Sequence, residues 1–269
     1  MAQKLDIETE IQLPDHIDNL FDLSGKVALI TTAASGLGRG IAYGMAKYGA
    51  NVACADLNLS GAEETAARIK GWGRDAIAVQ YDVSDWLQVE NMVERTADHF
   101  GRIDISFNLP GINNRKLVED LEPEEYEQVI DVNLKGMFHL CKAVGKVMIE
   151  QKKGKIINMS SIFGICAMDR QAGYASSKHG VLGLTKVLAI EWAKYNIQVN
   201  ALCPAHHLTP IVKELVSDEA WYDELIRKNP QHRFGEVWEV IGPAVFLASE
   251  ATSYVTGVAL PCDGGWTTQ

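Results

Sequence analysis

The sequence predicts an α/β fold: one doubly wound domain in which a parallel sheet of about seven strands carries helices on both faces. Short apolar runs of about five residues alternate with longer amphipathic stretches along the whole chain. No internal repeat or low-complexity tract interrupts this alternation. The length of 269 residues, with 47% hydrophobic and 22% charged side chains, is ordinary for one globular unit of this kind.

Strands are expected where apolar and β-branched residues run together, because parallel strands are buried on both faces. The expected strands are Lys26–Thr31, Asn51–Ala55, Ala76–Gln80, Ile103–Phe107, Lys155–Met159, Ile197–Leu202 and Val258–Leu260. The expected helices are Leu37–Tyr48, Leu59–Gly71, Asp85–Phe100, Pro123–Lys152, Tyr174–Tyr195 and Val237–Ser249. We therefore assign residues 21–269 to one Rossmann-type domain and residues 1–20 to an N-terminal extension with partial order.

Composition excludes several partners and compartments. Lys and Arg total 25 against 35 Asp and Glu, so the net charge of −10 argues against nucleic acid and anionic membranes. No apolar run approaches the ~18 residues of a membrane span, and Met1–Leu20 lacks the features of an export signal. The five cysteines are widely spaced and form no C-x-x-C pair. These features predict reduced thiols in a cytoplasmic protein without a metal site.

Small residues follow the first expected strand and open the next helix. Such a turn lets backbone N–H groups approach a pyrophosphate, and the helix N-terminus favours its charge. A glycine-rich turn needed only for close packing is the alternative. The candidate cofactor-binding residues of this turn are Thr32, Ser35, Gly36, Leu37 and Gly38.

Asp56 ends the second strand, at a distance from the glycine turn that suits an acid binding an adenosine ribose hydroxyl. A carboxylate there repels a 2′-phosphate, and no Lys or Arg lies between Thr31 and Leu37, so the sequence favours NAD over NADP. A simple helix cap is the alternative. Asp82 with Val83 and Asn108 follow the next two strands, where an adenine and its ribose would rest.

Ser161, Tyr174 and Lys178 are the strongest catalytic candidates. Ser161 ends the fifth strand, and the i, i+4 spacing of Tyr174 and Lys178 places both on one helix face. A phenol is a poor base near neutrality, but a nearby ammonium lowers its pKa toward useful values. A serine hydroxyl can hold a substrate oxygen beside that phenol. The alternative is a surface Tyr and Lys on an amphipathic helix.

Together these features resemble the short-chain dehydrogenase/reductase family, from about Phe21 to Trp266. The resemblance rests on the order and spacing of the glycine turn, the motifs above, and three further segments. These are Asn133 within Val132–Gly136, the run Asn200–Pro204, and the tail Tyr254–Trp266. The opening Phe21–Lys26 and the end of that tail look like members acting on sugar acids and polyols, such as gluconate dehydrogenase-like proteins.

The resemblance implies a role for each matching position. Tyr174 would be the general acid/base, with Lys178 lowering its pKa and binding the nicotinamide ribose. Ser161 would orient the reacting oxygen, and Asn133 would hold a water in a proton relay to Lys178. Thr209 would contact the carboxamide end of the cofactor. Family members are commonly homotetramers, so self-association is expected, paired through the expected helices Pro123–Lys152 and Tyr174–Tyr195.

Three departures from the family pattern flank the expected cofactor site. Thr32 stands in place of the first glycine of the turn, Pro110 lies in the N-N-A-G-like segment, and Ala205 replaces the glycine after Pro204. A β-branched residue is stiff, and proline lacks an N–H. These substitutions leave the catalytic residues intact but raise the question of cofactor affinity.

By family analogy, the substrate pocket is lined from three loops and is fairly polar. Its candidate residues are Asn113, Arg115, Phe163, Gln171 and His207. His206 and His207 are expected to contact substrate or cofactor rather than a metal, because adjacent residues on an extended chain point in opposite directions.

We therefore predict an NAD-dependent oxidoreductase that transfers hydride to or from a secondary alcohol or ketone of a sugar, polyol or sugar acid. Two alternatives stay open. One is a weakly active or inactive dinucleotide-binding protein, which the three departures motivate. The other is a 3-oxoacyl reductase-like enzyme, which would use NADPH and which Asp56 opposes.

Overall fold

The sheet in the computed structural model, which describes residues 13–210, 212 and 219–268, has seven parallel strands in the order β3-β2-β1-β4-β5-β6-β7. This confirms the expected fold class and strand number. The strands are β1 Val27–Thr31, β2 Asn51–Asp56, β3 Ala76–Gln80, β4 Ile105–Asn108, β5 Gly154–Met159, β6 Ile197–Pro204 and β7 Ala259–Cys262. β1 pairs with both β2 and β4, so the strand order reverses there and the loops after these strands diverge.

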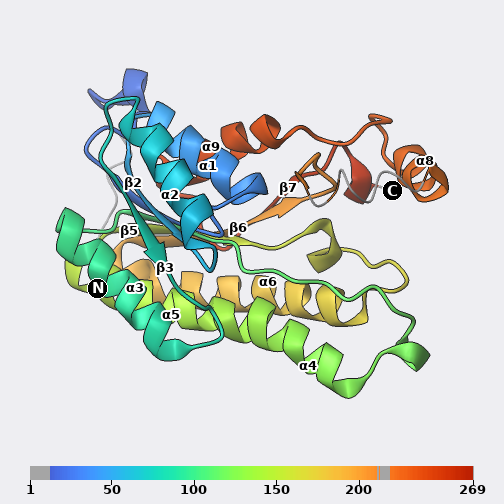
Figure 1. Cartoon of the computed structure of the whole chain (residues 1–269). Coiled ribbons are helices and arrows are strands. Elements are labelled where there is room, and N and C mark those ends of the chain that lie inside the picture. Colours follow the sequence, from blue (N-terminus) through green and yellow to red (C-terminus); the bar gives the residue numbers. More distant parts are fainter. Residues whose placement is uncertain (1–12, 211, 213–218, 269) are drawn as a thin grey trace, which may run out of the picture.

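Helices cover both faces of the sheet (Figure 1). On one face lie α1 Gly36–Lys47, α2 Leu59–Lys70 and α9 Ile241–Ala248. On the other lie α3 Trp86–Phe100, α4 Pro123–Ile130, α5 Gly136–Gln151 and α6 Ala172–Trp192. Each face has its own buried cluster, with Ile41 and Val245 in the first and Met92 and Leu140 in the second. Burying each such side chain contributes about 1.5–3 kcal/mol.

The structure differs from the expected elements in several places. Val237–Val240, the expected start of the helix that ends at Ser249, is a 3-10 helix that precedes α9. The expected helix Pro123–Lys152 is divided into α4 and α5 by a π-helical turn, Asp131–Lys135, in which the N–H of Gly136 bonds to the Asp131 carbonyl. Helix α8, Glu219–Lys228, was not expected. It packs through Leu225 onto a third apolar cluster beyond the end of the sheet, which a local pattern does not reveal.

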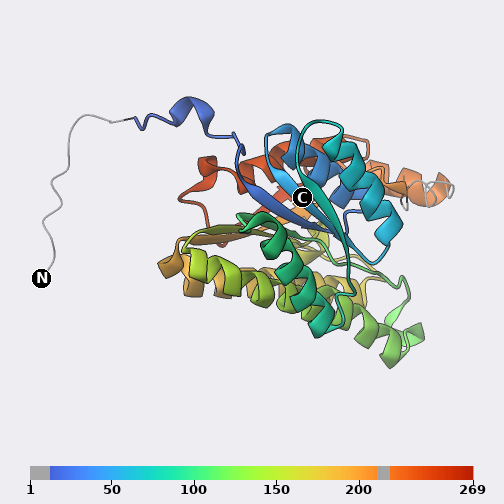
Figure 2. The same ribbon diagram turned by 60° about the vertical axis from the view of Figure 1, so that its left-hand side comes forward.

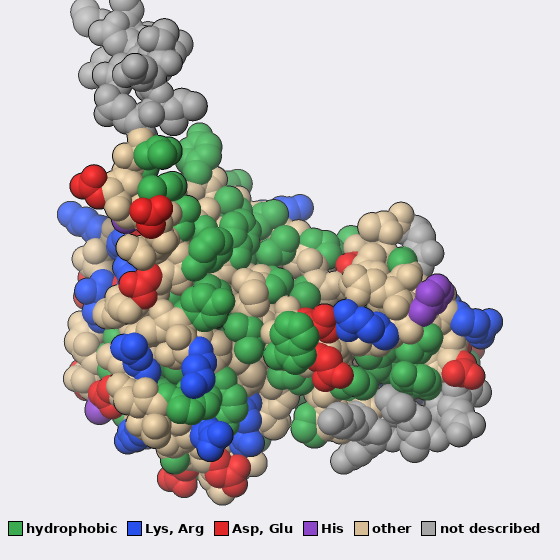
Figure 3. All heavy atoms as spheres, turned by 90° about the horizontal axis from the view of Figure 1, so that it is seen from above, with side chains coloured by type: hydrophobic (Ala, Val, Ile, Leu, Met, Phe, Trp, Pro, Cys, Tyr) green, Lys and Arg blue, Asp and Glu red, His purple; other side chains and the backbone are tan. Residues whose placement is uncertain are grey.

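Of the expected extension, residues 1–12 lie outside the described part of the chain. Residues 13–20 contain one short 3-10 helix, Ile17–Asn19, with no buried residue, and they project from the body of the domain (Figure 2). On the face seen in Figure 3, lysine and arginine side chains are interspersed with acidic and hydrophobic ones. None of the helices in the described ranges is long and apolar enough to cross a bilayer.

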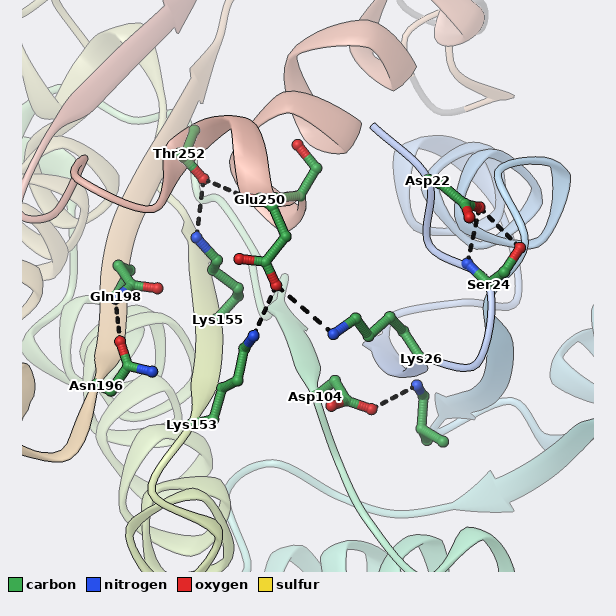
Figure 4. A network of polar contacts seen from close by, with 12 residues as sticks. Asp22, Ser24, Lys26, Asp104, Lys153, Lys155, Asn196, Gln198, Glu250 and Thr252 are labelled. Atoms are coloured by element: carbon green, nitrogen blue, oxygen red, sulfur yellow. Dashed lines mark hydrogen bonds and ion pairs between the residues drawn. The ribbon is translucent and has the colours of Figure 1, made fainter. Parts of the chain in front are cut away.

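Glu250 binds two lysines at the end of the sheet opposite the carboxyl ends of the strands (Figure 4). Its carboxylate lies 2.8 Å from Lys153 Nζ and 3.6 Å from Lys26 Nζ. The neighbouring Lys155 is buried and donates to Thr252 Oγ1 at 3.2 Å. Burial lowers the pKa of Lys155 to about 8, while the charge of Glu250 acts in the opposite direction.

Replacing Glu250 with glutamine should lower the free energy of unfolding by about 1 kcal/mol, because three ammonium groups would lose their shared carboxylate. Because the folded-state pKa of Lys155 lies below the ordinary lysine value of 10.5, the unfolded state binds more protons between about pH 8 and that value, and stability should rise with pH there. Urea unfolding at several pH values measures both effects. Glu224→Gln, which removes an exposed ion pair with Lys228, is the control. It should lower the free energy of unfolding less than Glu250→Gln does.

Candidate active site

The loops after β4, β5 and β6 gather at one end of the molecule, together with α8 (Figure 1). This is the carboxyl end of the parallel strands, where doubly wound sheets bind ligands. The expected catalytic and cofactor-binding residues come from these loops, from those after β1, β2 and β3, and from the helix starts that follow them.

The turn after β1 fits a pyrophosphate. Helix α1 begins at Gly36, and its N-cap residue Ser35 makes no capping bond, so the first N–H groups of the helix are not bonded by that side chain. By contrast, α2 and α3 are capped by Asn58 and Asp85. A Cβ on Gly38 would lie 2.7 Å from the Thr32 carbonyl carbon, so only glycine allows this close turn. The first N–H groups of a helix that its N-cap side chain does not bond, beside a glycine turn, suit the charge and size of a dinucleotide pyrophosphate.

Thr32 occupies the turn in a left-handed conformation, with φ of 56°. Glycine adopts this conformation freely, whereas a β-branched residue there is strained by roughly 1–2 kcal/mol. Its hydroxyl donates to the Leu109 carbonyl at 3.0 Å, which ties the turn to the loop after β4 and offsets part of that strain. The threonine side chain is thus anchored toward β4.

Asp56 forms hydrogen bonds to the backbone of the same turn and of the residues that follow β2. Its carboxylate accepts from Ala34 N–H at 2.8 Å and from Asn58 N–H at 2.9 Å. Asn58, not Asp56, caps helix α2, so the simple capping role considered for Asp56 does not apply. The nearby cation Arg39 is directed to Thr65 Oγ1, the Gly61 carbonyl and the Glu64 carboxylate.

The other cofactor candidates divide into two groups. Asp82 and Val83 are partly exposed after β3, and a methyl group of Thr209 would lie 3.5 Å from a Cβ on Gly36, which brings the loop after β6 to the phosphate turn. Asn108 is fully buried, and its amide donates to Asn158 Oδ1 at 3.0 Å within a polar network of the core. Any contact of Asn108 with a cofactor would therefore involve its backbone.

Ser161, Tyr174 and Lys178 are brought together as expected. The side chains of Tyr174 and Ser161 are hydrogen-bonded, and Lys178 Nζ lies 5.5 Å from the centre of the Tyr174 ring. Burial raises the pKa of Tyr174, whereas the Ser161 hydrogen bond and the Arg115 charge lower it.

Lys178 is almost fully buried, and its ammonium donates to the carbonyls of Met159 at 3.0 Å and Pro110 at 3.2 Å. Burial lowers its pKa to about 8. The proline that replaces the family's alanine therefore supplies a carbonyl that positions Lys178. That Lys178 lowers the pKa of Tyr174 stays a prediction, since the groups found to lower that pKa are Ser161 and Arg115.

Asn133 lies in the π-helical turn and is fully buried. Its side chain accepts from Ile112 N–H at 2.8 Å and donates to the Ile112 carbonyl at 2.9 Å. It also donates to Ser177 Oγ at 3.1 Å. Asn133 thus joins the loop after β4 to helix α6, which carries Tyr174 and Lys178, in the kind of helical irregularity that is frequent at functional sites.

The expected substrate residues Asn113, Arg115, Phe163 and Gln171 all lie around Tyr174. Asn113 donates to Gln171 Oε1 at 2.8 Å, and the Arg115 guanidinium lies 4.9 Å from the centre of the Trp221 ring. The Phe163 and Tyr174 rings are 6.4 Å apart. The sequence pattern did not indicate that Arg115 would influence Tyr174, because the two residues are far apart in the chain.

The two adjacent histidines face different surroundings, as expected for an extended segment. His207 pairs with the Ala205 carbonyl at 3.0 Å and packs against Gly235. His206 instead lies among aromatic rings that include Phe163. A cavity of about 360 Å³, lined by both histidines and by polar side chains such as Asn229 and Arg233, lies beside them.

This arrangement, a dinucleotide-type turn beside a Ser–Tyr–Lys group, defines an oxidoreductase acting on alcohol or ketone groups. Residues 32–267 match the family model described as enoyl-(acyl carrier protein) reductase. A D-threitol dehydrogenase of Mycolicibacterium smegmatis is 40% identical over 93% of this chain and 96% of the relative. A 2-dehydro-3-deoxy-D-gluconate 5-dehydrogenase of Dickeya dadantii is 36% identical over 92% of this chain and 98% of the relative.

A solved structure gives the same result. The crystal structure of a gluconate 5-dehydrogenase from Burkholderia cenocepacia in complex with NADP and tartrate is similar with a TM-score of 0.90 and 37% identity, covering 93% of this chain and 98% of that one. The chain belongs to the short-chain dehydrogenase/reductase family.

Proposed function

We propose that the protein is an NAD-dependent dehydrogenase of a small hydroxylated substrate, a polyol or a sugar acid, and that it oxidises a secondary alcohol or reduces the corresponding ketone. The Ser161–Tyr174–Lys178 group carries the proposal. A bound nicotinamide dinucleotide would supply the hydride acceptor or donor. The names of the similar proteins, which include a D-threitol dehydrogenase and a gluconate 5-dehydrogenase, support this substrate class.

The chain's own residues would handle the proton and the substrate oxygen. Tyr174 would take the proton of the alcohol or give it to the ketone, and the Ser161 hydroxyl would hold the same oxygen. Lys178 would bind the nicotinamide ribose, and Asn133 would hold a water that passes the proton toward Lys178. The turn residues Thr32 to Gly38, with Asp56, Asp82, Val83, Asn108 and Thr209, would hold the rest of the cofactor.

The preference for NAD is supported by charge at the end of β2. The Asp56 carboxylate would meet a ribose hydroxyl favourably and a 2′-phosphate unfavourably. Arg39, which could offset that repulsion, is bonded to Gly61, Glu64 and Thr65.

Titration with NADH and with NADPH, following nicotinamide fluorescence, tests this preference. NADH should bind more tightly, and Asp56→Asn should reduce the ratio of the two affinities about tenfold. Asparagine keeps a side-chain oxygen that can accept from Ala34 N–H, whereas Asp56→Ala would also remove this hydrogen bond to the turn. Tighter NADPH binding by the unaltered protein would overturn the preference for NAD, and it would fit both an NADP-binding sugar-acid dehydrogenase such as the similar gluconate 5-dehydrogenase and the 3-oxoacyl reductase-like alternative. Binding of neither would favour a protein without this activity.

The protein is also proposed to form a homotetramer through α4, α5 and α6. Large apolar side chains are exposed on all three helices, with Tyr126 on α4, Phe138 on α5, and Val187 and Ile190 on α6. Such exposed side chains are typical of contact surfaces between subunits. Light scattering should give four times the chain mass, and Ile190→Glu should lower that mass without lowering Tm sharply.

A location in the cytoplasm is supported by the five cysteines, which are free thiols.

A further inference from the structure

Two buried side-chain atoms in the described ranges lack a hydrogen-bond partner: Oδ1 of Asn113 and Nδ1 of His206. An unpaired polar atom costs roughly 1–3 kcal/mol when buried. Such atoms are few in folded proteins, and one reason for keeping them is that a ligand supplies the partner. The two residues follow different strands, β4 and β6, yet each contacts a neighbour of Tyr174. Asn113 bonds to Gln171, and the His206 ring lies near that of Phe163, which faces the Tyr174 ring.

His206 lies in a cage of aromatic rings next to the catalytic tyrosine. Its ring centre is 6.1 Å from that of Phe163, which in turn lies 6.4 Å from the Tyr174 ring. The cage also includes Trp221 at 6.1 Å, Phe234 at 5.4 Å and Trp266 at 5.2 Å. These rings hold the imidazole in place without offering it a strong hydrogen-bond partner.

The chemistry of the two atoms indicates what they would bind. Burial, with smaller effects of Arg115 and His207, lowers the pKa of His206 to about 4, so its imidazole is neutral near neutral pH. A neutral imidazole has one N–H and one lone pair, and the amide oxygen of Asn113 is an acceptor. A hydroxyl group both donates and accepts, so it satisfies either atom. A carboxylate has no proton to donate to the Asn113 amide oxygen, but it would suit the nearby guanidinium of Arg115.

We propose that His206 and Asn113 bind two hydroxyl groups of the substrate, one through imidazole Nδ1 and one through amide Oδ1. Gln171 holds the Asn113 amide through the 2.8 Å bond between them. This inference rests on the proposed function and narrows it: the substrate carries at least two hydroxyls besides the reacting oxygen. A substrate without them would leave both buried atoms unpaired, which gives selectivity.

The test compares polyhydroxylated probes, D-threitol and D-gluconate, with 2-butanol, a secondary alcohol without further hydroxyls. His206→Phe removes Nδ1, whereas His206→Asn keeps a side-chain nitrogen or oxygen near its position. For His206→Phe, KM for the better polyhydroxylated probe should rise about tenfold, with KM for 2-butanol unchanged and His206→Asn recovering much of the loss. Calorimetric titration of the same probe into the protein–NADH complex should show the same loss of affinity without turnover.

His99→Phe is the control, because His99 lies on α3 and pairs with Asp75 at the surface, away from the proposed site. It should change neither KM nor the calorimetric affinity, and Tm is recorded for every variant. Equal effects of His206→Phe on all substrates, or none on any, would overturn the inference. So would turnover of 2-butanol with no turnover or binding of the two probes, although the oxidoreductase function would stand. No turnover of any alcohol would instead count against the proposed function itself.

Discussion

Replacing Tyr174 with phenylalanine should lower kcat by roughly 10²–10⁴-fold, because the phenol is the group placed to exchange a proton with the substrate oxygen. Phenylalanine keeps the ring that packs beside Phe163 and removes only the hydroxyl bonded to Ser161. The fold should therefore survive, with Tm little changed. The measurement is the steady-state rate with the best alcohol found in a polyol and sugar-acid screen.

The pH dependence provides a second readout of the same residue. Below its pKa the Tyr174 phenol can only donate a proton, and above it the phenolate can accept one. Alcohol oxidation should therefore rise as the pH approaches that pKa, while ketone reduction should fall. Burial raises the pKa of Tyr174 and the Arg115 charge lowers it, so Arg115→Met should move the rise to higher pH.

Tyr195→Phe is the control for the loss of a phenol, since Tyr195 lies beyond the other end of α6. It should leave the rate and its pH profile unchanged. Substantial activity of Tyr174→Phe, with the pH profile of the unaltered protein, would show that another group transfers the proton.

The sequence predicted the sheet and the common helix face of Tyr174 and Lys178 because both depend on local patterns. Each strand is a short apolar run, and the i, i+4 spacing of Tyr174 and Lys178 fixes their common helix face. The π-helical turn at Asn133 had no such signal, since it results from one displaced backbone bond within a continuous helical pattern. Helix α8 was missed because its packing partners are distant in sequence.

The directions in which side chains point are the other feature that the sequence could not predict. An extended chain predicts that His206 and His207 face opposite ways, but not which of them lies near Tyr174. Packing decides this, because Gly235 leaves room for the His207 ring and the aromatic cluster takes His206. Likewise, Asn108 sits where a cofactor contact was expected, yet its amide completes a core network with Asn158.

Replacing Gly38 with alanine should weaken NADH binding by at least tenfold and destabilise the fold by about 1–3 kcal/mol. The added methyl group would collide with the backbone carbonyl of Thr32, and a backbone group cannot move aside as a flexible side chain can. Thr32 has little freedom to respond, because its left-handed conformation is held by the bond to the Leu109 carbonyl. The collision would therefore open the turn or shift the start of α1, and either change misplaces the N–H groups that would hold the pyrophosphate.

Gly242→Ala distinguishes this mechanism from a general effect of alanine at a helical glycine. Gly242 lies in the first turn of α9, and a Cβ there meets nothing within 4 Å. That variant should bind NADH normally and be as stable as the unaltered protein or slightly more so, by up to about 1 kcal/mol. NADH fluorescence titration and urea unfolding measure both variants. If Gly38→Ala behaved like Gly242→Ala, the close turn would not be what holds the cofactor, and the affinity would have to come from Asp56 and the loops after β3 and β6.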